Sequence, residues 1–290
     1  MKHSDNLFEY PIKIELPSLW EQLVHFDQYQ KSYDFPLVSI IIPTCNCAHS
    51  ITLTLESVFN QEYPNLEVIV IDNSTDRTIE IIEGYKNEKI RVFSVSTNAR
   101  YEMLNKGLSL ATGQYVNFLF PGDFYIYHQT LKYMMSLAVQ QDFPDLIYCG
   151  TLLRDGISEA KILFRDLSLE LLKRGQQPTS LQSCWFKTAS LREIGKFNQH
   201  YHLRGGFELM CRFCLKKIYR FMPVNRVLTD YDLRSYTKRM VLIHFWETMK
   251  ILYFYFGLGI TLRWLFFYQK DFRRFIKLWL KSFRHAFAGH

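Results

Sequence analysis

Four polar residues directly follow apolar runs in the first half of the chain, where they could form a ligand site. They are Thr44, Asp72, Asp76 and Asp123. If the runs are strands of an open α/β sheet, these residues lie beyond the carboxyl ends of the strands, where such sheets bind ligands. A carboxylate such as Asp72 can accept hydrogen bonds from a base or ribose, and one such as Asp123 can hold a divalent cation that neutralises a diphosphate.

Ordinary structural roles can also explain each of these residues. Asp72 and Asp76 can cap the helix that follows them, and Asp123 can belong to a tight turn. Lys106 can contact a phosphate or lie in solvent at a helix end. No Gly-x-Gly-x-x-Gly or Walker sequence follows the first apolar run, which argues against the usual dinucleotide and P-loop sites. Spacing alone leaves both explanations open.

The elements that must position these residues alternate between strands and helices. Apolar, β-branched runs predict strands at residues 38–42, 66–71, 90–95 and 115–120. Apolar residues at helical spacing predict helices between them, at residues 51–59, 79–82 and 101–108. Because such alternation implies parallel strands, we expect an open, mostly parallel α/β sheet with flanking helices.

The second half of the chain predicts a mixed arrangement. Asp155-Gly156 is a typical hairpin turn between apolar runs at 152–153 and 162–164. A helix is expected at 207–217, followed by short strands, and from Met240 the pattern is helical and strongly aromatic. The expected division is an N-terminal extension at 1–36, an α/β domain at 37–237 and a helical C-terminal region at 238–290.

Composition predicts a globular protein in a reducing compartment. Of the 290 residues, 48% are hydrophobic and 22% are charged, which is close to the globular average. The six scattered cysteines are too sparse for a disulfide scaffold. Acidic residues interrupt the first 36 residues, so no apolar stretch there could serve as a signal peptide. We therefore expect a cytoplasmic protein.

Cys211 and Cys214 permit two interpretations. Together with Cys45 and Cys47 they could bind zinc. They lie three residues apart on a predicted helix that also carries Phe207, however, and this favours buried, apolar cysteines.

Positive charge is concentrated at the C-terminal end of the chain. Lys and Arg greatly outnumber Asp and Glu in residues 201–290, and the whole chain carries a net charge of +7. Residues 251–268 contain a single charge, Arg263, and residues 272–287 combine a Trp and Phe face with a basic face. Such a helix suits an anionic membrane surface, and its wide apolar face argues against nucleic acid as the partner. We expect peripheral attachment to the inner face of the membrane, with packing on the protein's own core as the alternative.

Several short stretches carry a more specific signal. They are VSIIIPTCN at 38–46, TLESVFNQ at 54–61, LEVIVIDNSTD at 66–76, YEMLNKG at 101–107, ATGQY at 111–115, LFPGD at 119–123, LQS at 181–183 and IGKFN at 194–198. Together they resemble the family 2 glycosyltransferases with the GT-A fold, and the last two stretches resemble members that build bacterial exopolysaccharides. The resemblance covers about residues 37–235.

This resemblance implies inverting transfer of a sugar from a nucleotide diphosphate, UDP in the first instance, to a saccharide or lipid-linked acceptor. It implies that Thr44, Asp72 and Asp76 contact the nucleotide. It also implies that Lys106 contacts the phosphates and that Asp123 binds Mg²⁺ or Mn²⁺.

Two departures from the family's pattern bear on activity. The acidic motif usually has two or three Asp, whereas here Phe120 and Gly122 leave only Asp123. Gly206 stands where the family places its general base, so the nearest candidate base is Glu208, about 200° further round the helix. A helix N-terminal acid is the structural alternative for Glu208. A catalytically degenerate protein that binds nucleotide or glycan, or acts as a scaffold, is the alternative function.

Overall fold

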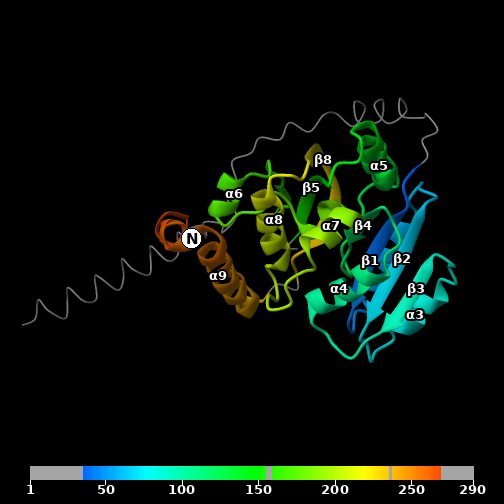
Figure 1. Ribbon diagram of the computed structural model, residues 1–290. Coiled ribbons are helices and arrows are strands. Elements are labelled where there is room, and N and C mark those ends of the chain that lie inside the picture. The colour runs from blue at the N-terminus through cyan, green and yellow to red at the C-terminus, as the bar shows by residue number, and fades with distance from the viewer. Residues whose placement is uncertain (1–34, 155–158, 235–236, 269–290) are drawn as a thin grey trace, which may run out of the picture. The chain divides into compact units, whose positions relative to one another are not determined.

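The chain forms a mixed α/β sheet with helices on both faces (Figure 1). The computed structural model describes residues 35–154, 159–234 and 237–268. Within these residues the strand order is β3-β2-β1-β4-β7-β5-β6, and β8 pairs with β5. The strands are β1 (Val38–Thr44), β2 (Leu66–Asp72), β3 (Ile90–Ser94), β4 (Tyr115–Phe118), β5 (Leu146–Arg154), β6 (Lys161–Leu163), β7 (Cys184–Lys187) and β8 (Phe221–Asp232).

The first half of the sheet is parallel, as the sequence predicts. β1 pairs in parallel with β2 and β4, and β2 pairs in parallel with β3. The register places Thr44 beside Asp72 at the carboxyl edge. The helices of this half are α2 (Ile51–Phe59), α3 (Thr78–Gly84), α4 (Arg100–Leu110) and α5 (Thr130–Gln140).

The second half of the sheet is mixed. β7 lies antiparallel between β4 and β5, and β6 pairs antiparallel with β5 as the predicted hairpin requires. The hairpin turn itself, at residues 155–156, lies outside the described residues. β8 is a single strand of 12 residues, parallel to β5, where the sequence predicts two short strands. The helical elements here are α6 (Leu169–Lys173), η1 (Leu181–Ser183), α7 (Thr188–Ile194) and α8 (Gly205–Lys216).

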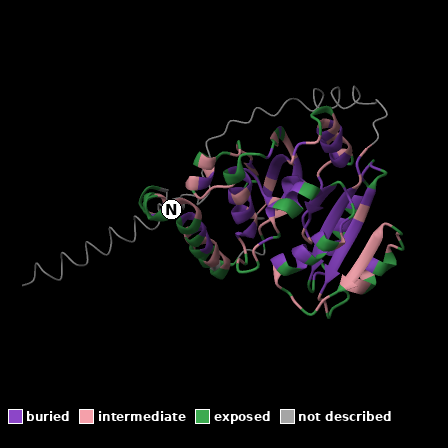
Figure 2. Cartoon of the chain, viewed as in Figure 1, coloured by how far each residue is buried: buried purple, intermediate pink, exposed green. Residues whose placement is uncertain are grey.

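Two apolar clusters fill the layers on either side of the sheet, and Figure 2 shows its strands largely buried. Alternate residues of β1 serve the two clusters, since side chains along a strand point to opposite faces. Ile41 joins the cluster that contains α4 and α8, whereas Ile40 and Ile42 join the one that contains α2 and α5. Burial on both faces explains why β1 reads as a continuous apolar run.

The C-terminal helix α9 (Lys238–Arg263) packs by one face on the cluster that contains α4 and α8. Ile251 and Leu252 are fully buried. Trp264, in the following π-helical turn η2 (Trp264–Tyr268), packs on Gly175, where an added Cβ would come within 2.4 Å of the indole Nε1. Gly257, with φ of 79°, kinks the helix. α9 therefore completes the core of the α/β domain as well as lying at its surface.

Parts of the expected division lie outside the described residues. These are the N-terminal extension, apart from Phe35 and Pro36, and the amphipathic segment at 272–287. The expected boundary at residue 237 falls at the start of α9.

Candidate functional site

The carboxyl ends of β1 and β2 hold two predicted site residues in direct contact. Thr44 Oγ1 donates to Asp72 Oδ1 at 2.7 Å, and the Asp72 side chain is buried. Ser74 donates to the same carboxylate twice, through its backbone N–H at 2.8 Å and its hydroxyl at 2.7 Å. These bonds fix one orientation of the Asp72 carboxylate at the edge of the sheet.

Asp76 lies in the same loop but is exposed to solvent. Its Oδ1 accepts the Thr78 N–H at 3.0 Å at the start of α3, and its Oδ2 accepts the Ala48 N–H at 3.3 Å. The hydrogen bond from the Thr78 hydroxyl lowers the pKa of Asp76. Asp76 thus accepts the first N–H of α3 from the position before the N-cap residue Arg77, and it joins the loops that follow β1 and β2.

Asp123 follows β4 in a tight turn. Its N–H donates to Phe120 O at 2.9 Å, and Gly122 has φ of 96°, which favours glycine. The carboxylate is 2% exposed; its Oδ1 accepts the Asp232 N–H at 2.9 Å and its Oδ2 accepts the Gln182 amide at 2.9 Å. Burial raises the pKa of Asp123 well above its usual range.

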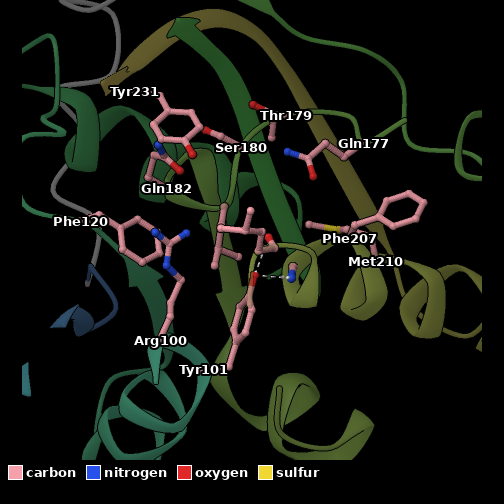
Figure 3. Close-up of a pocket in the computed structure, with 13 residues that line it drawn as sticks. Arg100, Tyr101, Phe120, Gln177, Thr179, Ser180, Gln182, Phe207, Met210 and Tyr231 are labelled. Atoms are coloured by element: carbon pink, nitrogen blue, oxygen red, sulfur yellow. Dashed lines mark hydrogen bonds between the residues drawn. The ribbon is translucent and has the colours of Figure 1, made fainter. Parts of the chain in front are cut away.

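Gln182 connects Asp123 to a pocket of about 60 Å³ (Figure 3). Its walls come from the start of α4, the segment that follows β4, the 177–182 segment, the start of α8 and the end of β8. The lining residues are Arg100, Tyr101, Phe120, Gln177, Thr179, Ser180, Leu181, Gln182, Leu203, Gly206, Phe207, Met210 and Tyr231. Within the described part of the chain, this lining contains no Asp, Glu or His.

Arg100 supplies positive charge to this pocket. Its guanidinium carbon lies 4.7 Å from the centre of the Phe120 ring. Figure 3 shows the guanidinium beside Phe120, on the side where Gln182 and Tyr231 lie. A guanidinium in this position can bind two phosphate oxygens at once.

Gly206, which stands where the family resemblance predicts a general base, lines the pocket. Its N–H donates to the Tyr101 hydroxyl at 3.2 Å, and that hydroxyl donates to Leu203 O at 2.8 Å. An added Cβ at Gly206 would meet Leu181 Cδ1 at 3.7 Å, which is ordinary contact. An added Cβ at Gly205 would come within 2.7 Å of the Tyr101 ring. A side chain therefore fits at position 206 and not at position 205.

Glu208 is not among the pocket residues. Its carboxylate is 2% exposed and accepts two hydrogen bonds from Arg212, from Nε and from Nη2, each at 2.9 Å. Tyr255 of α9 donates its hydroxyl to the same carboxylate. Arg212 also donates to Ile194 O and Gly195 O, each at 3.0 Å. This network joins α7, α8 and α9, and it favours a structural role for Glu208; catalysis by Glu208 stays a prediction.

Lys106 is exposed on α4 and is likewise not among the pocket residues. Its neighbour Asn105 is buried, donating to Phe197 O at 2.9 Å and accepting the Phe197 N–H at 2.8 Å. In the YEMLNKG stretch, Asn105 thus has a structural role and Lys106 faces solvent.

Sequence reasoning did not single out Arg100, Gln182 or Tyr231 as site residues. Arg100 and Tyr231 come from α4 and β8, which are far apart in the chain, so only the fold reveals their proximity. Gln182 did carry a signal, because it belongs to the LQS stretch, one of the stretches on which the family resemblance depends.

The cysteines of α8 are buried, as expected. Burial raises the pKa of Cys214 to about 12 and also raises that of Cys211. No three His, Cys, Asp or Glu side chains gather into a metal-binding group among the described residues.

The family model described as Glycosyl transferase family 2 matches residues 39–190. The chain therefore belongs to glycosyltransferase family 2. It is similar to the PGL/p-HBAD biosynthesis glycosyltransferase of Mycobacterium bovis (strain BCG / Pasteur 1173P2), with 27% identity over 203 residues, which are 68% of this chain and 77% of that protein.

Solved structures of two other proteins share the fold. S. aureus TarS 1–349 in complex with UDP-GlcNAc aligns with a TM-score of 0.61 and 19% identity, over 81% of this chain and 74% of that one. The same protein in complex with UDP is 22% identical, with a TM-score of 0.60, over 74% of this chain and 64% of that chain. The mannosyltransferase PcManGT from Pyrobaculum calidifontis, in complex with GDP-Man and Mn²⁺, gives a TM-score of 0.56 at 17% identity, over 84% of this chain and 81% of that one. The expected GT-A type fold is confirmed.

Proposed function

We propose that this glycosyltransferase transfers a sugar from a UDP-sugar to a saccharide or lipid-linked acceptor in glycan biosynthesis. The observation that carries the proposal is the bond from Gln182 to Asp123, because it links the carboxyl edge of the sheet to a pocket containing Arg100. The nucleoside lies at Thr44 and Asp72, and the diphosphate lies between Asp123 and Arg100. The TarS complex with UDP-GlcNAc supports a donor of this type. Asp76 contacts the nucleotide from the same loop.

A divalent cation, Mg²⁺ or Mn²⁺, belongs to this proposal. Each Asp123 oxygen accepts one hydrogen bond from the chain and keeps a further lone pair. One carboxylate is enough when substrate phosphates complete the coordination. A cation would also compensate the negative charge that burial disfavours at Asp123. When bound, the cation would neutralise the diphosphate leaving group. Arg100, which lines the pocket, adds a second positive charge beside the diphosphate. It takes the phosphate-contacting role that the resemblance implies for Lys106, which is exposed.

Inverting transfer needs a group that takes the proton of the acceptor hydroxyl. The pocket's carboxylate-free lining and the engagement of Glu208 by Arg212 favour a second candidate function. In it the protein binds the donor, or supports a partner enzyme, with little turnover. Both candidate functions use the same donor site. They differ in whether a proton acceptor operates in the pocket beside Gly206.

The donor site is tested by titrating UDP into the protein by calorimetry, with and without Mn²⁺. We expect Mn²⁺ to strengthen UDP binding to the wild type and Asp123→Ala to remove this metal dependence, with a loss of at least about tenfold in affinity. Glu83→Ala, which removes an exposed carboxylate of α3, is the control and should bind as the wild type does. UDP affinity that ignores Mn²⁺ in the wild type, or survives in Asp123→Ala, would remove Asp123 from the site.

We also propose that the protein attaches peripherally to the cytoplasmic face of an anionic membrane. Among the described residues, the helix Arg239–Phe267 is long and apolar enough to cross a membrane by length and composition. One face of it is committed to the core through Ile251 and Leu252, which supports lying on the surface instead of spanning it. This location would place the enzyme beside a lipid-linked acceptor.

A further inference from the structure

A second and larger cavity lies between the 198–202 loop and α9. Its volume is about 510 Å³. Aromatic side chains form much of its wall, including Tyr201, Trp246 and Phe254. Arg239 and Lys250, both exposed, stand on the same wall. We call this cavity the α9 groove; it combines an apolar surface with positive charge.

The acid that lines the α9 groove is already engaged by the chain. Glu247 Oε1 accepts the His202 N–H at 2.6 Å, and Oε2 accepts the N–H groups of Leu203 at 2.9 Å and Arg204 at 2.8 Å. Its side chain is 6% exposed. The charges that remain open to a ligand in the groove are therefore basic, and they suit an anionic group such as a phosphate.

The α9 groove adjoins the donor-site pocket through one short loop. His202 lines the groove, whereas the next residue, Leu203, lines the pocket, as does Gly206. The Tyr101 hydroxyl holds this loop from the pocket side, and Glu247 holds it from the α9 side. A molecule seated in the groove therefore needs to extend only across this loop to present a hydroxyl beside Gly206.

Exposed apolar side chains lie on α9 both at the groove and beyond it. Phe254, at the groove, is 76% exposed, and Leu258 and Leu262 follow it at intervals of four residues with 58% and 42% exposure. Residues four apart lie on the same face only of an unbroken helix, so Leu258 and Leu262 share a face, whereas Phe254 lies before the non-helical Gly257. The kink at Gly257 falls within this stretch. The surface thus offers an anion site at one end and a contact for a long apolar chain at the other.

We propose that the α9 groove binds the lipid phosphate of a lipid-linked acceptor. Lys250 binds the phosphate, the apolar chain lies against Phe254, and the saccharide reaches over the 202–204 loop toward Gly206. A two-fold dimer through this groove is disfavoured, because Arg239 and Lys250 of one copy would face the same basic residues of the other. The inference rests on the proposed glycosyl transfer for the identity of its ligand, whereas the groove itself can be tested without any donor.

The test is calorimetric binding of three monomeric probes to the full chain: farnesyl phosphate, inorganic phosphate and dihexanoylphosphatidylglycerol. We expect farnesyl phosphate to bind at least tenfold more tightly than either of the others. Lys250→Glu should weaken its binding tenfold or more. Arg263→Glu, which reverses an exposed charge on the same helix outside the groove, should change it by less than twofold. UDP titrations of both variants should match the wild type, so a failed donor site is distinguished from a failed groove.

Three results would overturn the inference. Equal weakening by Lys250→Glu and Arg263→Glu would indicate a general charge effect along α9. Equal affinity for farnesyl phosphate and dihexanoylphosphatidylglycerol would assign the groove to bilayer headgroups. If the wild type does not bind farnesyl phosphate, and both variants melt at the wild-type temperature, the groove does not bind this ligand.

Discussion

At the scale of single residues, a substitution at Gly206 distinguishes the two candidate functions, sugar transfer and donor binding without turnover. Because an added Cβ there makes only ordinary contact with Leu181, Gly206→Asp should be accommodated and should place a carboxylate in the pocket. Under the low-turnover candidate, donor hydrolysis or transfer should rise by about 10²- to 10⁴-fold, the usual contribution of a general base; under active transfer, the added carboxylate should not raise the rate. The measurement is UDP release from UDP-sugars at saturating donor.

Two control variants sharpen this experiment. Gly206→Asn has nearly the same shape without the charge and should leave the rate unchanged. Gly205→Asp should lower stability instead, because its Cβ would lie within 2.7 Å of the Tyr101 ring. If the wild type already turns over rapidly and Gly206→Asp slows it, the proton acceptor lies elsewhere and the low-turnover candidate fails.

The buried carboxylate of Asp123 should make stability depend on pH in an unusual direction. Burial raises its pKa above the ordinary value of 3.8, so between these two values the folded state holds more protons than the unfolded chain. The contribution of Asp123 to the free energy of unfolding therefore falls as the pH rises from its unfolded pKa toward its folded pKa. Without metal, Asp123→Asn should gain stability relative to the wild type as pH rises from 3.8, measured by urea unfolding.

Asp76 provides the control of opposite sign. Its pKa is lowered by the Thr78 hydroxyl, so its contribution is present above the unfolded pKa and is lost as pH falls. Asp76→Asn should therefore lose stability at neutral pH. A stability difference between Asp123→Asn and the wild type that does not vary with pH would contradict the assignment of a raised pKa.

The sequence predicts where the polar residues that follow parallel strands lie, whereas their functional roles stay predictions. Thr44, Asp72 and Asp123 are expected at one edge because the strand ends of a parallel sheet meet there, and the structure places Thr44 and Asp72 at the ends of β1 and β2 and Asp123 in the turn after β4. Arg100 and Tyr231 could not be predicted in this way. Their proximity depends on the parallel pairing of β8 with β5, which no local pattern encodes.

At the scale of elements, the Glu208 network holds α8 against α9. Because the Glu208 carboxylate is buried and bonded to both Arg212 and Tyr255, Glu208→Gln should destabilise the fold by about 3 kcal/mol, as for other broken buried pairs. Glu170→Gln breaks an exposed Glu–Arg pair of the same spacing on α6 and should cost under about 0.5 kcal/mol. Urea unfolding of the two variants measures both.

The opposite result would support Glu208 as the catalytic base. If Glu208→Gln is as stable as Glu170→Gln while UDP release falls by orders of magnitude, the carboxylate acts as the base despite its pairing with Arg212.

The parallel half of the sheet is predictable because each of its strands is followed by a helix of clear periodicity. The sequence does not predict β7, because its residues carry no alternating pattern and it pairs antiparallel with β4 and β5, outside the strand–helix alternation of the first half. Its place is set by distant contacts, including the Asn117 amide, which donates to Gln182 O and Cys184 O, each at 2.9 Å. Those contacts also position Gln182 to donate to Asp123. The same distant contacts therefore place both β7 and Gln182, neither of which the sequence identifies.

At the scale of the whole molecule, α9 packs one face on the core and leaves another face exposed. Trp264 and Ile251 face the core, while Tyr253 and Phe267 are 61% and 68% exposed. The exposed charges of the described helix are basic, at Arg239, Lys250 and Arg263. A truncation before α9 would remove core residues and expose the 202–204 loop, so surface substitutions are the appropriate test of membrane binding.

We expect the full chain to co-sediment with phosphatidylglycerol vesicles and much less with phosphatidylcholine vesicles. Each Lys or Arg near an anionic surface contributes about 1 kcal/mol, and salt screens this attraction, so binding should weaken as ionic strength rises. Leu258→Asp with Phe267→Asp should reduce binding, because both side chains are exposed on the C-terminal helix outside the α9 groove. Ile218→Asp, at a site 65% exposed just after α8, is the matched control and should bind as the wild type does. Equal partitioning of all three proteins, or a wild type that stays in the supernatant with both lipids, would contradict membrane attachment through α9.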